Sequence, residues 1–226
     1  MFRNIAAACA LVLTPVSFAA AEGQLTYTAD AGKMGRMEMT ERWTAEALRM
    51  DIEGMDAYML LKGDEIYSVT VASGQVMVFP LSQLKKMGGA GGNAGPSADQ
   101  AGVVFPEEIS KMRATGETRE VAGIEGEIYD VDWTDNSGTA RTVSAVLTDD
   151  PRLLEHQALK MRFIRQISGE APNPLMTEMQ DRGLAALTFG DRFRVLSLTD
   201  EAGPAGDFEL PAAPVDFGDM MNMGNQ

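Results

Sequence analysis

Cysteine and histidine are almost absent from this chain of 226 residues, which has one of each, Cys9 and His156. Cys9 lies in a predicted secretion leader, so the exported chain should have no thiol for a disulfide, a nucleophile or a thiolate metal site. With one imidazole, the exported chain lacks most of the side chains that the commonest catalytic sites and metal sites use. We therefore expect a protein that is not an enzyme and that carries no cofactor.

Basic residues are also scarce, because 19 Lys and Arg stand against 33 Asp and Glu and give a formal net charge of −14. An acidic surface repels phosphate backbones and anionic lipid headgroups. Long hydrophobic runs are missing as well: the apolar run from Ile5 to Val16 is too short to span a bilayer. These absences predict a protein that binds no nucleic acid and is not membrane-integral, and we expect a monomer.

The N-terminus has the three parts of a signal peptide. Arg3 supplies the positive charge, the run from Ile5 to Val16 is the apolar region, and Ala19-Ala20-Ala21 is a small-residue cleavage site. We expect residues 1–21 to be removed by cleavage after Ala21, before Glu22. The predicted localisation is the periplasm of a bacterium.

Period-two alternation in short runs follows from Glu22 onward and is typical of antiparallel strands joined by hairpins. Met37, Met39 and Trp43 share one face of such a strand, and the next strand runs from Leu48 to Ile52. Further strands are predicted at 58–61, 66–71 and 76–79. A helical turn is predicted at 82–87, and residues 88–102 are a Gly-rich loop with few side chains to pack.

The second half adds helices to the strands. We predict a short helix at 106–112, strands at 115–121, 126–133 and 139–147, and a final hairpin from strands 184–189 and 193–198. Asp150 and Pro151 are start signals for the main helix, which Gly169 ends. A short helix is predicted at 175–182, and residues 212–226 should be a disordered tail.

The single histidine falls inside the apolar arc of the main helix, between Leu159 and Phe163. A catalytic imidazole needs an orienting carboxylate and a nucleophile, and the chain has no Gly-x-Ser-x-Gly elbow. We interpret His156 as a structural residue, either packed in the core or half-exposed.

The fold class that follows is mainly β with some helix: an incomplete antiparallel barrel of about eleven strands wrapped around one main helix, in a single domain over residues 22–211. The octet from Gly116 to Gly123, the stretch Glu127 to Val131, the triplet Arg49-Met50-Asp51 and the stretch Phe208 to Pro211 resemble the signature of an uncharacterised exported bacterial domain of unknown function. More distantly, the pattern is similar to the LolA-like lipoprotein carriers. That resemblance implies a half-barrel with an apolar concave cavity, and no functional residue of those carriers maps onto a motif here.

Methionine is abundant, with 16 residues. Met is an adaptable filler of cores and also suits surfaces that accept ligands of variable shape. We predict a non-catalytic binding module for an apolar ligand, such as an acyl chain, a lipid or a lipoprotein anchor, with a wall that includes Met37, Met39, Trp43, Met50, Met59, Met77 and Trp133. The alternative is a Met-rich protein that handles Cu(I), in which Met220, Met221 and Met223 supply soft sulfur ligands.

Overall fold

The computed structural model describes residues 22–72, 74–86, 103–169 and 172–215. The predicted signal peptide 1–21, the whole Gly-rich segment 88–102 and the three candidate copper ligands Met220, Met221 and Met223 lie outside these residues. The predictions made for them therefore stay predictions.

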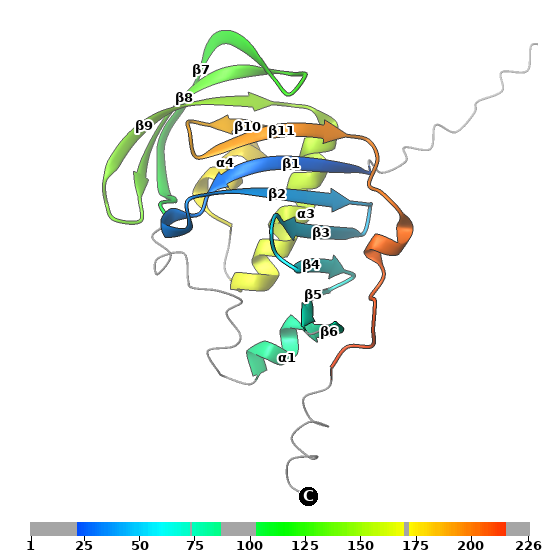
Figure 1. The fold of residues 1–226 in the computed structure, drawn as a ribbon. Coiled ribbons are helices and arrows are strands. Elements are labelled where there is room, and N and C mark those ends of the chain that lie inside the picture. Colours follow the sequence, from blue (N-terminus) through cyan, green and yellow to red (C-terminus); the bar gives the residue numbers. More distant parts are fainter. Residues whose placement is uncertain (1–21, 73, 87–102, 170–171, 216–226) are drawn as a thin grey trace, which may run out of the picture.

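The described residues form one open sheet of 11 antiparallel strands in the order β6-β5-β4-β3-β2-β1-β11-β10-β9-β8-β7 (Figure 1). This confirms the mainly β fold class and the predicted strand number. The first and last strands of the chain pair with each other, so they join two meanders into one sheet. The strands are β1 (Gly23–Asp30), β2 (Arg36–Trp43), β3 (Ala47–Ile52), β4 (Ala57–Lys62), β5 (Glu65–Ala72), β6 (Gln75–Pro80), β7 (Pro106–Val121), β8 (Ile124–Asp135), β9 (Ala140–Thr148), β10 (Ala185–Phe189) and β11 (Phe193–Thr199).

The helices lie where the capping signals place them. In α3 (Pro151–Ser168), the Asp150 carboxylate accepts the backbone N–H of Arg152, and Gly169 ends the helix with a φ of 73°. In α4 (Pro174–Asp181), Asn173 caps the N-terminus in the same way. The remaining helical elements are α1 (Leu81–Lys86), η1 (Gly32–Met34) and η2 (Ala205–Phe208). The predicted helical turn is thus confirmed, with Met87 outside the described residues.

The sheet curves around α3 and α4, which lie on one side of it (Figure 1). The main core cluster joins Leu159 and Phe163 of α3 to strand residues such as Trp43, Leu48 and Leu61. A second cluster packs Leu175 and Met179 of α4 against β8 and its neighbours. On the other side of the sheet, Phe208 and Ala202 cover Leu60. The first meander is therefore covered on both faces, as the apolar run 58–61 predicts.

The predicted helix at 106–112 is wrong, because these residues are the first part of β7. Pro106, Ile109 and Met112 pair with Asp135, Trp133 and Val131, and the register shifts between each pair of partners. Each β-bulge adds one residue to β7, so its buried positions recur every three residues instead of every two. That spacing imitates a helix in the sequence, and only the partner strand reveals it as a strand.

Among the described residues, no helix combines the length and the apolar character that a membrane crossing requires. At the other end of the chain, the predicted tail 212–226 begins with described residues. The backbone N–H of Val215 donates to the Val78 carbonyl at 2.8 Å, beside the edge strand β6.

Candidate functional site

A cavity of about 310 Å³ lies between α3, α4 and the concave side of β1 and β10. Its apolar wall combines aliphatic, aromatic and Met side chains from six elements and from the segment before β7. These apolar residues are Leu25, Ala29, Val104, Phe105, Pro106, Leu153, Leu175, Met176, Met179, Ala185, Ala186, Phe189 and Phe193. The polar residues of the wall are Tyr27, Asp30, Glu41, His156, Gln157, Lys160 and Arg192.

One side of α3 supplies four of these residues. Leu153, His156, Gln157 and Lys160 are spaced by three, one and three positions, so they follow one another along a single face of the helix. The first is apolar and the other three are polar. This face of α3 therefore gives the cavity a polar end beside an apolar one.

A fully buried carboxylate anchors the polar end. The alternation of β2 places Glu41 on the same face as Met39 and Trp43, and the exposed fraction of its side chain is 0%. The Tyr27 hydroxyl donates to Glu41 Oε1 at 2.5 Å, and His156 Nε2 lies 2.5 Å from Glu41 Oε2. Lys160 Nζ forms an ion pair with Glu41 and lies 3.2 Å from the Tyr27 hydroxyl.

The groups of this cluster shift one another's pKa values. Burial alone raises the pKa of Glu41, but the charge of Lys160 and the hydrogen bond from His156 outweigh burial and hold that pKa below its ordinary value. Burial, and then the charge of Glu41, raise the pKa of Tyr27 well above its ordinary value. Glu41 is thus an anion that accepts hydrogen bonds, and His156 donates to it from Nε2.

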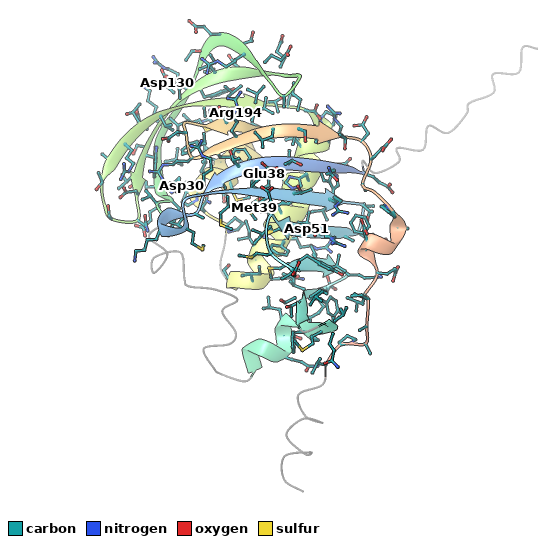
Figure 2. The ribbon with its side chains drawn as sticks, in the orientation of Figure 1. Asp30, Glu38, Met39, Asp51, Asp130 and Arg194 are labelled. Atoms are coloured by element: carbon teal, nitrogen blue, oxygen red, sulfur yellow. The ribbon has the colours of Figure 1, made fainter. Side chains whose placement is uncertain are left out.

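A second ion pair borders the cavity. Arg192 Nη1 lies 3.2 Å from a carboxylate oxygen of Asp30, which is labelled in Figure 2 at the end of β1. The same guanidinium nitrogen donates to the Val104 carbonyl at 3.4 Å. This pair ties the segment before β7 to the end of β1.

Gln157 differs from the other polar residues of the wall. Its side chain is 8% exposed and lines the cavity, yet its amide makes no hydrogen bond to any residue that the structure describes. Its amide atoms are not among the side-chain atoms that are both shut off from solvent and unpaired in the described residues. The amide is therefore reached from the cavity, which is the space that a ligand would fill.

The structure brings most of the predicted ligand-binding residues to one face, although not to this cavity. Strands β2 to β6 pair without register shifts, so six of the seven side chains point to the side of α3: Met37, Met39, Trp43, Met50, Met59 and Met77. Trp43 contacts the His156 ring at a centroid distance of 5.0 Å and belongs to the main core. Trp133 packs in the second core cluster. None of the seven is among the residues that line the cavity.

The predicted site residues do not include Glu41, Gln157 or Lys160. Glu41 could have been noticed in the sequence, because this carboxylate alternates with Met39 and Trp43 on the face of the strand that is otherwise apolar. His156 is buried, with an exposed fraction of 8%, and its partner is a carboxylate from a distant strand. Nothing in the sequence pairs α3 with β2.

No protein-family model, curated protein or solved structure matches the chain. Within the described residues, no group of three or more His, Cys, Asp and Glu side chains is arranged to hold a metal ion.

Proposed function

We propose that this protein is a non-catalytic binding module for an apolar ligand, such as a single acyl chain, which occupies the cavity between α3, α4 and the sheet. The proposal includes export to the periplasm. The observation that carries it is the cavity of about 310 Å³, whose wall is mostly apolar and has a few polar groups at defined places. Small-molecule sites typically measure about 300–1,000 Å³ and have this composition.

The wall suits a flexible chain. Met176 and Met179 on α4 offer unbranched side chains that adapt to ligands of varied shape. At about 0.8 kcal/mol per buried methylene, a chain of about eight methylenes gains about 6 kcal/mol before the losses from immobilisation. The expected affinity is micromolar or weaker, which suits a carrier that must release its ligand.

Two further features support binding without catalysis. Among the residues that the structure describes, those that line the cavity include no Ser, Thr or Cys, so this part of the wall offers no hydroxyl or thiol of those types as a nucleophile. An open antiparallel sheet that curves around helices is also the arrangement that the resemblance to LolA-like carriers implies.

The test is a fluorescent apolar probe and its displacement by fatty acids of increasing length. The purified protein should enhance the fluorescence of the probe, and longer chains should displace it better until the cavity is filled. Met176→Trp, which fills part of the cavity, should weaken probe binding about tenfold or more. Met55→Trp is the matched control, because Met55 is 50% exposed and does not line the cavity.

Two results would overturn the proposal. One is the absence of any probe binding to the folded wild-type protein. The other is equal binding by wild type and Met176→Trp, since a probe that ignores this side chain does not occupy the cavity.

A further inference from the structure

We propose that the cavity selects ligands whose polar head is uncharged and both donates and accepts hydrogen bonds, with a primary amide as the closest match. This inference rests on the proposed function, because it assumes that an apolar chain fills the rest of the cavity. It concerns the polar wall alone and goes beyond binding of an acyl chain as such.

The formal charges of the wall already neutralise one another. Glu41 is paired with Lys160, and Asp30 is paired with Arg192. His156 donates a hydrogen bond from Nε2 to Glu41. The described wall therefore contributes two cations and two anions in pairs and leaves no counter-charge for a ligand.

An ionised head would consequently lose its hydration without compensation. A charge that enters a largely apolar cavity is costly unless it meets an opposite charge and hydrogen bonds. A carboxylate would also approach a protein with a net charge of −14. An ammonium head would likewise find both carboxylates of the wall, Glu41 and Asp30, already paired. Neither sign of charge therefore meets a free counter-charge.

Gln157 supplies what an uncharged head needs. It lies on the cavity-facing side of α3 between Leu153 and Lys160, is more than nine-tenths buried, and has no hydrogen-bond partner among the described residues. Its side chain offers one carbonyl acceptor and two N–H donors. A ligand amide can accept from the Gln157 NH₂ and donate to the Gln157 carbonyl, which would pair both sides of an amide that faces the cavity.

The experiment compares three ligands with the same ten-carbon chain at pH 7: decanamide, decanoate and decylammonium. Each is titrated calorimetrically into the wild-type protein at 150 mM salt. Decanamide should bind at least tenfold more tightly than either ion. The comparison needs no variant, so the proposal stays falsifiable even if a variant fails to fold.

Gln157→Met then tests the assigned residue, because Met keeps the length of the side chain and removes the amide. It should weaken decanamide binding about fivefold to tenfold, the value of one or two ordinary hydrogen bonds, and leave decanoate binding nearly unchanged. Gln180→Leu is the matched control on α4, since Gln180 is exposed and does not line the cavity. The melting temperature of each variant verifies that it is folded.

The outcomes separate this inference from the proposed function. If all three ligands bind and either ion equals decanamide, the selectivity is refuted and the apolar binding module stands. Unchanged decanamide binding by folded Gln157→Met also refutes the inference. If neither the apolar probe nor any of the three ligands binds, both proposals fail together.

Discussion

The two ends of the sheet differ in regularity. From β1 to β6, successive strands pair without a register shift. From β7 to β11 the ladder is irregular, with three shifts between β7 and β8 and one between β9 and β10, and one more occurs where β11 meets β1. Bulges bend a strand and redirect its side chains. The cavity borders this irregular part, on β1, β10 and the segment that leads into β7.

The regular and the irregular part of the sheet also differ in how much of their surface is buried. The regular end buries side chains on both of its faces, with Leu61 facing α3 and Leu60 facing the segment around Phe208. That segment is also fixed by ion pairs, because Asp207 contacts both Arg42 and Arg49. In contrast, most residues of β7 are exposed. A continuous ladder favours a dense core, whereas an irregular one leaves room for a cavity.

The largest effect is expected at Glu41, on β2 of the regular part, where the side chain lines the cavity. Glu41→Gln removes the anion that pairs with Lys160 and accepts from His156, and should destabilise the protein by about 3–5 kcal/mol in urea unfolding. Glu38→Gln is the control on the same strand, labelled in Figure 2, since Glu38 has no ion partner in the described residues. It should change stability by about 0.5 kcal/mol or less. Similar losses for the two variants would contradict the role of the buried cluster.

The pH dependence of the unfolding free energy gives a second test of the role of Glu41. The pKa of Glu41 in the folded protein lies below its ordinary value of 4.5, so its stabilising effect is complete above that pH and is lost as the pH falls toward the folded-state pKa. The difference in unfolding free energy between wild type and Glu41→Gln should therefore be constant from pH 6 to 7 and shrink below about pH 4.5. A difference that does not change down to pH 3 would oppose this assignment.

The next effect compares two leucines that are truncated in the same way. Leu61→Ala, at a residue that is 0% exposed in the regular part, should lower the unfolding free energy by about 3–4 kcal/mol. Leu175→Ala, at a residue that is 8% exposed and already borders the cavity, should lower it by about 2 kcal/mol or less. Chemical denaturation measures both, and an equal loss would mean that the cavity wall is packed as densely as the core.

A smaller effect comes from adding one methyl group to a glycine in each part. A Cβ at Gly126 on β8 would lie 2.7 Å from the Leu147 carbonyl oxygen, so Gly126→Ala should cost about 1–3 kcal/mol through backbone displacement. At Gly63, in the β4–β5 turn, the surrounding space is open, and only its φ of +60° opposes Ala. Gly63→Ala should cost about 1 kcal/mol. A greater loss at Gly63 would reverse the comparison of the two parts.

The smallest effect is expected at the regular edge of the sheet. Ending the chain after Pro211 removes the hydrogen bond from Val215 to Val78 and should change the unfolding free energy by about 1 kcal/mol or less. Thermal unfolding of the shortened protein measures it. A loss of several degrees in the melting temperature would show that the residues after Pro211 are packed against the fold.

Local patterns explain which parts of the fold could be predicted. The alternation in the first meander specifies strands because neighbouring side chains point to opposite faces whatever the partner strand is. Asp150, Pro151 and Gly169 define the ends of α3 because a helix cap depends on a few consecutive residues. The first part of β7 could not be predicted, because its bulges give a strand the spacing of a helix.

The candidate site could not be predicted from such local patterns. Composition and short periods depend on neighbouring residues, and they indicate an acidic, mainly β chain with a structural histidine and many methionines. The tertiary fold brings His156 to Glu41, 115 positions away, and places Gln157 at the cavity, where it has no hydrogen-bond partner among the described residues. The reason is physical: a buried carboxylate is stable only beside its donors, and the packing of α3 on the curved sheet brings those donors to β2.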